Sequence, residues 1–363
     1  MRRKVVQTVP GTDVLQDSLS IHRLDAASAE RWDAFVRDCP EATFFHRAGW
    51  KAVIEEALGH DCPFSFAERD GVICGILPLV HIKSLLFGNS LASTGFTVGG
   101  GPAVLPGPDY EAIHHALDAE AVRLAEALGV GHLEYRGRSP RHSDWAHNPG
   151  LYVGFRKAIG PDPEKDMLEI PRKQRAMVRK GIKAGLVSEI DRDAERLHPI
   201  YAESVRNLGT PVFPKNYFNQ LLTVFGDDAD IVTVLSDGVP VASVMNFYFR
   251  NEVLPYYGGG TFDARRVAGN DFMYWEVMRR AVERGYTLFD FGRSKLGTGA
   301  FSFKKNWGFE PEPLDYEYRL FKLDSIPEVN PLNPKYRYFI AAWKRLPLPV
   351  ANFVGPFLAR NLG

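Results

Sequence analysis

Cysteine is scarce in this chain of 363 residues, and the few cysteines form no recognisable pattern. There are three of them, an odd number, and no two are spaced as a CxxC pair. A disulfide framework is therefore excluded, and ordinary thiols in a reducing compartment are expected. The ten histidines are scattered, without an HExxH motif or a close His/Asp pair, so we expect no metal site.

Long apolar runs and a net charge are also missing. No apolar stretch reaches the roughly 18 residues that a membrane-spanning helix needs. Residues 1–18 begin with basic residues but lack the apolar run of a secretory signal, and we interpret them as a loose leader. Lys and Arg total 44, as do Asp and Glu, which argues against a protein that coats DNA with its whole surface. We expect a cytoplasmic location and no DNA partner.

The remaining composition is that of a folded protein, with 45% hydrophobic and 24% charged residues. The length suggests two domains, each large enough to bury a core. Each half contains two apolar runs of β type joined by an Asp-Gly pair, which is favoured in the type I′ turns of hairpins. These pairs are Asp70-Gly71 and Asp237-Gly238.

The two halves resemble each other in order and in sequence. The segment LEYRGRS (Leu133–Ser139) has a counterpart, LFDFGRS (Leu288–Ser294), 155 residues later, and each follows a long helical pattern ended by glycine. We interpret this as an internal duplication of an α/β unit with mixed, α+β-type sheets. Two unrelated α+β domains with common turn chemistry are the alternative.

The duplication predicts four parts. After the leader, we expect a first domain over residues 19–160 and a second over residues 161–322, because proline and glycine interrupt both periodicities near residue 160. Residues 323–363 would form a C-terminal tail.

A strongly basic helix is predicted over about residues 164–184. Its segment PRKQRAMVRKGIKAG contains no acidic residue, and four cations share one face at spacings of three and four. They are Arg172, Arg175, Arg179 and Lys183. Such a face is explained by an anionic ligand such as phosphate, RNA or acidic lipid, or else by simple solvation.

The segment YYGGGTFDARRVAGND (Tyr256–Asp271) predicts a strand, a glycine-rich turn and the start of a helix, in that order. Amide groups at a helix start bind anions, and glycine allows close approach. Gly258, Gly259, Gly260 and Asn270 are candidates for a donor-binding loop, to which Arg265 and Arg266 add charge. A glycine-rich bend in a twisted sheet is the alternative.

A third segment, FDFGRSKLGTGAFSFKKNWGF (Phe289–Phe309), places polar residues at the end of a strand and in the loop that follows. This arrangement is typical of binding sites. GTGAFSFKK does not match a P-loop, so nucleoside triphosphate binding by such a loop is rejected. The candidate substrate-binding residues are Arg293, Lys295, Lys304, Lys305 and Trp307.

The order YGGG, Asn, Trp, RGY, FDFG, FKK and WGF resembles the FemAB family over about residues 20–320. That family consists of tandem GNAT-like (N-acetyltransferase-type) domains. PRKQRAMVRKGIKAG and GRSKLGTGAFSFKKNWGFEP resemble in particular the FemAB-type subgroup associated with exosortase/PEP-CTERM exopolysaccharide systems.

The resemblance implies acyl transfer to an amine. Classical Fem proteins move an aminoacyl group from charged tRNA onto a peptidoglycan precursor, whereas related tandem-GNAT proteins act as acyl-CoA-type transferases in polysaccharide pathways. The family lysine of the F-K-[KR] loop, implicated at the substrate phosphate or the transition state, corresponds to Lys304. No obvious coiled-coil hairpin is present, which favours an acyl-CoA donor over tRNA. No permanently bound cofactor is implied, and the acceptor would be a small molecule or a lipid-linked glycan.

The chemistry needs a group that takes a proton from the attacking amine and donors that stabilise the oxyanion. No Ser-His-Asp or Cys-His pattern is visible, so we expect direct transfer without a covalent enzyme intermediate. Besides Lys304, the candidate catalytic residues are Asp290 and Tyr257. Asp290 could instead cap a loop, and Tyr257 could be a core aromatic.

The tail is basic and rich in aromatic residues, with no acidic residue after Glu328. Pro347, Pro349 and Pro356 exclude one long helix. Such a composition suits the surface of an anionic membrane, which would make the protein peripheral on the inner face; a strap packed on the body is the alternative. A non-catalytic scaffold derived from a transferase and held at a membrane is the rival function.

Overall fold

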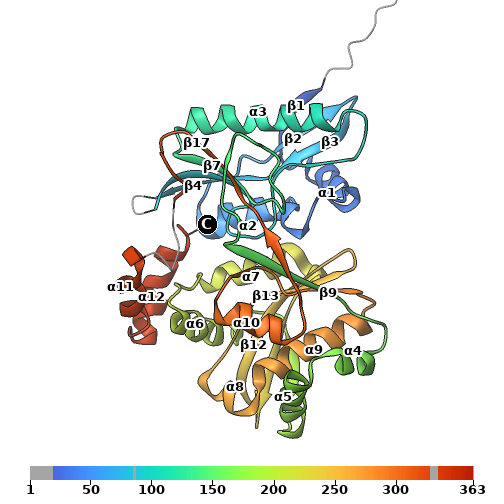
Figure 1. The fold of residues 1–363 in the computed structure, drawn as a ribbon, viewed down its shortest axis with the longest axis vertical. Coiled ribbons are helices and arrows are strands. Elements are labelled where there is room, and N and C mark those ends of the chain that lie inside the picture. Colours follow the sequence, from blue (N-terminus) through green and yellow to red (C-terminus); the bar gives the residue numbers. More distant parts are fainter. Residues whose placement is uncertain (1–18, 85–86, 328–333, 363) are drawn as a thin grey trace, which may run out of the picture.

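The computed structural model describes residues 19–84, 87–327 and 334–362. They form two α/β units, one above the other in Figure 1, with a pair of C-terminal helices beside the lower one. The predicted class, tandem units with mixed sheets, is confirmed. The predicted leader lies outside the described residues.

The lower, second unit is built on one long sheet. Its strands follow the order β10, β11, β12, β13, β14, β9 and β15, and β16 also pairs with β9. In that order their bounds are Val187–Asp191, Ala229–Ser236, Val239–Phe249, Glu252–Gly260, Leu288–Asp290, Tyr152–Ala158, Ser294–Lys295 and, for β16, Pro311–Leu314. All neighbouring strands are antiparallel except β13 and β14, which are parallel.

Helices cover both faces of this sheet because alternate residues of its strands are apolar on each side. Helices α6 (Leu197–Leu208) and α7 (Lys215–Phe225) lie on one face, and α9 (Gly269–Glu283) lies on the other with α5 (Arg172–Lys183) packed against it. The remaining helices are α4 (Pro163–Glu169), α8 (Phe262–Val267), α10 (Gly299–Asn306) and the 3₁₀ turn η2 (Gly226–Asp228).

The upper, first unit has the same plan, but its sheet is divided. One part has the order β1, β2, β3, β6 and the other the order β4, β5, β7, β17, β8. Pro78 separates β3 from β4, since proline has no amide hydrogen to donate to a neighbouring strand. The strand bounds are β1 Ser20–Arg23, β2 Ser65–Arg69, β3 Val72–Leu77, β4 Leu79–Ser84, β5 Gly88–Ser93, β6 Ala103–Val104, β7 His132–Tyr135, β8 Ala146–His147 and β17 Glu317–Leu320. The helices are α1 (Ala29–Asp38), η1 (Phe44–His46), α2 (Gly49–Leu58) and α3 (Tyr110–Leu128).

The order of elements confirms the predicted duplication. Each unit runs strand, two helices, hairpin, one or more further strands, long helix and strand. The strand after the long helix pairs in parallel with an earlier strand of the same unit, β7 with β5 in the first and β14 with β13 in the second. Both hairpins turn at the predicted Asp-Gly pairs, whose four residues all have positive φ, as a type I′ turn requires.

The two units exchange a strand. β9, which follows the first unit in sequence, pairs with β14 of the second unit, and β17, which follows the second unit, pairs with β7 of the first. A boundary at residue 160 did not anticipate this exchange, because the repeat in the sequence does not indicate where each final strand pairs.

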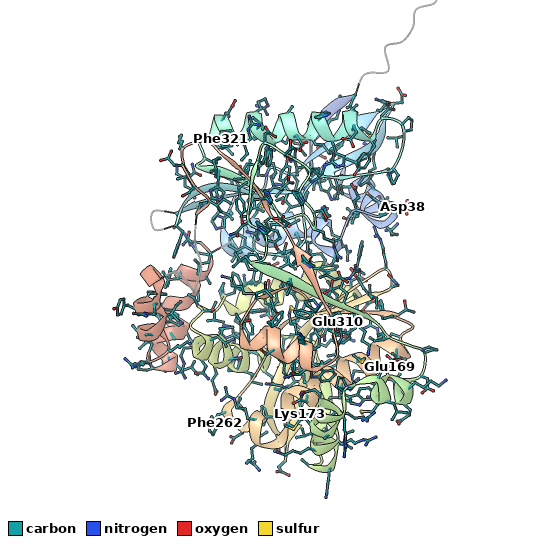
Figure 2. The ribbon with its side chains drawn as sticks, in the orientation of Figure 1. Asp38, Glu169, Lys173, Phe262, Glu310 and Phe321 are labelled. Atoms are coloured by element: carbon teal, nitrogen blue, oxygen red, sulfur yellow. The ribbon has the colours of Figure 1, made fainter. Side chains whose placement is uncertain are left out.

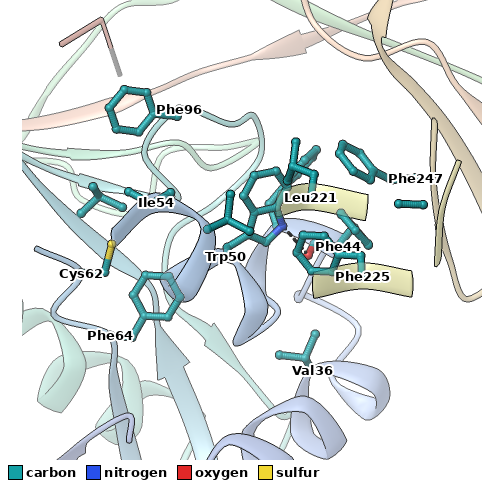
Figure 3. Packing of buried hydrophobic residues seen from close by; sticks show 14 of the residues in the cluster. Val36, Phe44, Trp50, Ile54, Cys62, Phe64, Phe96, Leu221, Phe225 and Phe247 are labelled. Carbon is teal, nitrogen blue, oxygen red and sulfur yellow. Dashed lines mark hydrogen bonds between the residues drawn. The ribbon is translucent and has the colours of Figure 1, made fainter. Parts of the chain in front are cut away.

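One hydrophobic core runs through both units. Phe44 of the first unit lies 4.7 Å from the ring of Phe225 and 4.6 Å from that of Phe247, both in the second unit. Figure 3 shows these rings together with Trp50, whose Nε1 donates a hydrogen bond of 3.1 Å to the carbonyl of Phe44. The units are therefore packed as one body.

Two elements differ from expectation. The single basic helix over residues 164–184 is two helices, α4 and α5, because Pro171 disfavours helical geometry at Ile170 and ends the first. The glycine run 258–260 is not a loop: it completes β13, where it pairs with Ala242–Val244 of β12.

The tail forms two helices, α11 (Pro334–Trp343) and α12 (Leu348–Ala359), which rest against α6 and the segment that follows it. The chain breaks at Pro347 as predicted, although Pro356 lies inside α12. In the described part of the chain, no helix is long and apolar enough to cross a membrane.

Replacing Phe44 with alanine should lower the free energy of unfolding by about 3–5 kcal/mol, because a large ring is lost from the core that joins the units. Urea denaturation followed by tryptophan fluorescence measures this change. Val72→Ala, at a position that is 65% exposed, is the control and should change stability by less than about 0.5 kcal/mol. A loss for Phe44→Ala no larger than the control's would contradict a shared core.

Candidate functional site

The two parallel strands at the centre of the second sheet separate soon after they meet. β13 and β14 pair only at Glu252 with Leu288 and at Val253 with Phe289. β13 then continues to Gly260 alongside β12, and an irregularity in their register at Met245/Asn246 changes its course. β14 ends at Asp290, so the segment after it can turn toward α10. This end of β14 is where two of the three candidate catalytic residues, Asp290 and Lys304, come together.

A turn held by Asp290 follows the strand. Gly292 has a φ of 69°, a left-handed conformation that favours glycine, and its amide donates a hydrogen bond of 2.7 Å to Oδ1 of Asp290. Oδ2 of Asp290 lies 3.5 Å from Nε of Arg156 on β9. Burial raises the pKa of Asp290 above its usual range. Asp290 therefore holds the turn that presents the next residues.

Lys304 reaches this turn from α10. The helix starts at Thr298, whose hydroxyl accepts a hydrogen bond from the amide of Phe301. Nζ of Lys304 donates to the carbonyl of Gly292 at 3.2 Å and to that of Arg293 at 3.0 Å. Aromatic rings lie near the same ammonium group, so Lys304 is held in a partly apolar surrounding.

This surrounding changes the charge of Lys304. Burial lowers the pKa of its amine to about 7, although the nearby carboxylate of Asp290 opposes this shift. The rings of Phe155 and Phe291 lie 5.7 and 5.8 Å from Nζ. The amine is therefore partly protonated near neutral pH, so a small change in the charge nearby is enough to shift it to the charged or the neutral form.

Arg293 connects this site to the exchanged strands. Its Nη1 donates a hydrogen bond of 3.1 Å to the hydroxyl of Tyr316, and its guanidinium carbon lies 4.3 Å from the ring centre of Tyr152. Nζ of Lys295 lies 5.4 Å from the same Tyr152 ring. Tyr152 belongs to β9 and Tyr316 precedes β17, so both exchanged segments contribute an aromatic ring to one cation.

The first unit adds a second buried guanidinium. Arg136, at the end of β7, donates to Glu134 at 3.0 Å and to the carbonyl of Thr97 at 2.9 Å. Burial alone would lower the pKa of Arg136, but the carboxylate of Glu134 outweighs it and the pKa lies above its usual range. Tyr152, Tyr316 and Arg136 were not predicted from the sequence, in which only the likeness of LEYRGRS to LFDFGRS indicates this strand end.

Tyr257 lies apart from these cations. It is buried in the aromatic core, its hydroxyl is 2.8 Å from that of Tyr217, and burial raises its pKa well above the usual range. The structure therefore places Tyr257 as a core residue.

Trp307 is also a packing residue. Its side chain is buried, and its Nε1 donates to Oδ1 of Asp271 at 3.2 Å, which attaches the end of α10 to the start of α9. Gln174 of α5 donates a hydrogen bond to the same oxygen. The neighbouring Lys305 is exposed. Asp271 therefore joins three helices around the start of α9.

Exposed cations lie on two helices packed against α9, and we call this group the basic surface. Figure 2 shows Lys173 of α5 and Phe262 of α8 at the same lower end of the molecule. The members predicted from the sequence are Arg172, Arg175, Arg179, Lys183, Arg265 and Arg266. Arg175 is half-buried and donates a hydrogen bond of 2.7 Å to the carbonyl of Leu168, while the others are exposed. The surface also contains the exposed Asp263.

The three glycines of β13 are required by close packing. A Cβ at Gly258 would lie 2.8 Å from Val244 and one at Gly259 2.5 Å from Ser204, while at Gly260 it would collide with the side-chain oxygen of Asn270. That oxygen of Asn270 is buried and has no hydrogen-bond partner among the described residues. The glycines thus let the strand pass close to its neighbours, and Asn270 offers an unused acceptor.

Comparisons with known proteins agree with this architecture. Residues 171–305 match the sequence profile of a family described as an acetyltransferase (GNAT) domain. No curated protein sequence matches the chain. Among the described residues, no group of three His, Cys, Asp or Glu side chains is placed to hold a metal ion.

Solved structures share the tandem fold. A crystal structure of FemX is similar over 88% of this chain and 100% of its own, with a TM-score of 0.65 and 15% identity. A tandem GNAT protein from the clavulanic acid biosynthesis pathway is similar over 85% of this chain and 100% of its own, with a TM-score of 0.55 and 14% identity. The C-terminal domain of a putative lysylphosphatidylglycerol synthetase from Agrobacterium fabrum covers 81% of this chain and 92% of its own length, with a TM-score of 0.53 and 15% identity.

The pKa of Lys304 predicts a change of stability with pH. The folded protein releases this proton above about pH 7, whereas the unfolded chain retains it to about pH 10.5, so the unfolded state binds more protons in between. The free energy of unfolding of the wild type should therefore rise, relative to that of Lys304→Met, as pH increases from 7 to 10. Urea denaturation across this range measures the difference.

Lys305→Met, at the exposed neighbouring position, is the matched control for this experiment. Its stability should run parallel to that of the wild type at every pH. A Lys304→Met variant that also stays parallel would contradict the placement of the Lys304 amine in a partly apolar surrounding.

Proposed function

We propose that the protein is a GNAT-type N-acyltransferase that transfers an acyl or aminoacyl group to an amine on a phosphate-linked sugar or envelope precursor. The observation that carries this proposal is Lys304, held by two carbonyls at the point where β13 and β14 separate, inside the stretch that matches the acetyltransferase family. An acyl-CoA is the proposed donor, in agreement with the family described by that profile.

The proposed reaction forms a carbon–nitrogen bond and breaks the thioester bond. The acceptor amine attacks the thioester carbonyl, gives up a proton, and the thiol leaves when the tetrahedral oxyanion collapses. Lys304 in its protonated form would donate a hydrogen bond to this oxyanion or to a substrate phosphate. Holding both substrates between the units would supply much of the remaining acceleration.

The proton-transfer roles considered for Asp290 and Tyr257 have less support. The carboxylate of Asp290 accepts the amide of Gly292, and the hydroxyl of Tyr257 is paired with Tyr217 inside the core. Asp290 acts instead as a positioning residue for Lys304, because it shapes the turn whose carbonyls hold the ammonium group. The amine proton would then leave to solvent or to another group of the site.

The donor would bind to the second unit alone. Its connection between β13 and α9 carries Arg265 and Arg266, whereas the corresponding connection of the first unit, residues 94–109, contains no Lys or Arg. In the first unit the carboxylate of Glu41 accepts the amide of Val104 at 2.9 Å and a hydrogen bond from Tyr110. In the first unit a phosphate of the donor would therefore lie beside a carboxylate and be repelled, whereas in the second unit it would lie beside cations and be attracted.

The acceptor would lie nearer the cations between the units. Arg293 and Lys295, which are only partly buried, suit an anionic group of the acceptor. The resemblance to the exosortase/PEP-CTERM subgroup makes an exopolysaccharide or cell-envelope precursor, handled in the cytoplasm, the proposed acceptor.

The test is release of thiol from acetyl-CoA in the presence of amino sugars with and without a phosphate group. We expect turnover to be faster with the phosphorylated acceptors and to fall about a hundredfold or more in Lys304→Met. Lys305→Met is the control and should retain activity within about threefold, since its side chain is exposed. Absence of thiol release with every acceptor, together with absence of CoA binding in native mass spectrometry, would favour the scaffold function instead.

The charge of Lys304 sets the pH dependence of this activity. Lys304→Arg keeps a cation at all pH values, whereas the amine of the wild type loses its proton above about pH 7. The ratio of wild-type to Lys304→Arg kcat/KM should therefore fall as pH rises through 7, and titration of the acceptor amine cancels in this ratio. A ratio that rises with pH would assign Lys304 the role of proton acceptor.

The basic surface predicts a separate effect on donor binding. Arg265→Ala/Arg266→Ala should raise KM for acetyl-CoA about tenfold and leave kcat nearly unchanged, because phosphate contacts far from the reacting carbonyl contribute to binding. Arg123→Ala/Lys165→Ala, which removes two exposed cations elsewhere, is the control. Tight binding of charged tRNA that weakens steeply with salt would identify an aminoacyl-tRNA donor.

A further inference from the structure

The outward side of the C-terminal helix pair is unusually apolar for an exposed surface, and we call it the tail face. Phe353 is 73% exposed and Phe357 is 60% exposed, and their rings lie 6.0 Å apart on one side of α12. The spacing of Val350, Phe353 and Phe357 keeps all three on that side. The other exposed members are Tyr338 and Phe339 of α11. Large apolar side chains gathered in this way mark an interaction surface.

The opposite side of α12 is packed on the protein. Ala351, Gly355 and Ala359 recur every four residues and are buried. A Cβ at Gly355 would lie 3.1 Å from the backbone nitrogen of Val212, so this helix approaches the body closely. The phenylalanines therefore face outward because small residues face inward, and not because the helix is detached.

Polar contacts fix the same arrangement. Nε1 of Trp343 donates a hydrogen bond of 3.2 Å to the carbonyl of Thr210, and Nη1 of Arg206 donates one of 3.1 Å to the carbonyl of Lys344. The carbonyl of Arg360 accepts a hydrogen bond from His60 of the first unit. The tail face is thus a fixed surface held on both units, which agrees with the alternative of a strap packed on the body. Phe353 and Phe357 on its outer side stay exposed among the residues that the structure describes.

The charged residues of the tail itself have one sign. No acidic residue follows Glu328, although the chain as a whole is neutral. The exposed cations of the two helices and their flanks are Arg337, Lys344, Arg345 and Arg360. In the part of the chain that the structure describes, none of them forms an ion pair with a carboxylate. Aromatic residues surrounded by unpaired cations match a partner that is apolar inside and anionic at its surface.

Helix α12 is too short to span a bilayer but long enough to lie on its surface. α12 contains 12 residues and so is about 18 Å long, shorter than a hydrocarbon core of about 30 Å. Helices of this kind lie in the interface with their apolar side chains inserted and their cations near the lipid phosphates.

We propose that the tail face docks the protein on an anionic lipid bilayer, with Phe353 and Phe357 inserted and the four cations at the headgroups. This role is independent of the proposed catalytic function. It would keep the enzyme on the surface where lipid-linked acceptors are held, but docking itself needs no acceptor.

The experiment is flotation of the full-length protein with vesicles of phosphatidylcholine alone or of phosphatidylcholine mixed with an equal part of phosphatidylglycerol. We expect binding to the anionic vesicles that weakens with salt, and little binding to the neutral ones. Phe353→Ser/Phe357→Ser should lower partitioning at least about tenfold, and Arg345→Gln/Arg360→Gln about tenfold or more. Thiol release with a soluble acceptor should be unchanged in both variants.

Val72→Ser/Leu168→Ser is the control, because it removes two apolar side chains that are 65% and 62% exposed on other elements. It should bind vesicles as the wild type does, and matching thermal melts would show that all variants fold. Equal binding by the wild type and Phe353→Ser/Phe357→Ser would overturn the proposal. A dimer in solution that becomes a monomer in this variant, without vesicle binding by the wild type, would assign the tail face to a second copy of the chain instead.

Discussion

The exchange of final strands between the two units is the constraint on which the rest of the molecule depends. β9 completes the second sheet and β17 completes the first, so each unit reaches its full set of strands only through a segment that belongs, in sequence, beside the other. The same two segments bring Tyr152 and Tyr316 to Arg293. The surroundings of Arg293 are therefore a product of the connection between the units, and a second unit without the two exchanged segments would lack both tyrosines.

Duplication followed by divergence explains why the two halves look alike in backbone and differ in chemistry. Asp290, which holds the turn before Arg293, corresponds to Tyr135 in the first unit, whose hydroxyl instead bonds to Asp118. The first unit also places Glu41 where the second presents arginines. The second unit thus presents exposed cations near the start of its long helix, whereas the first has internal hydrogen bonds there and pairs its strand-end cation, Arg136, with Glu134.

The features predicted correctly from the sequence are those set by local chemistry. Asp-Gly turns, the glycine that ends α3 and the strand that follows each long helix depend on a few neighbouring residues, so the repeated plan could be predicted from the sequence. The exchange of β9 and β17 depends on pairing between distant segments, which no local pattern specifies. For the same reason the surroundings of Arg293, which include Tyr152 and Tyr316, could not be predicted. The glycine run was expected to form a loop because its packing against Ser204 and Asn270 is visible only in three dimensions.

The electrostatics of the site follow from the same packing. Lys304 sits among aromatic rings and carbonyls with one carboxylate nearby, and this balance lowers the pKa of its amine to about 7. An arriving phosphate or a developing oxyanion adds negative charge beside the amine and raises its pKa, so the charged form is stabilised most when substrate is present. A permanently charged residue such as arginine would lose the solvation of its charge in the free enzyme as well. A lysine can stay neutral in the free enzyme and become protonated when an anionic substrate binds, so it avoids that cost until the substrate is present. This is a physical reason for lysine, and not arginine, at this position.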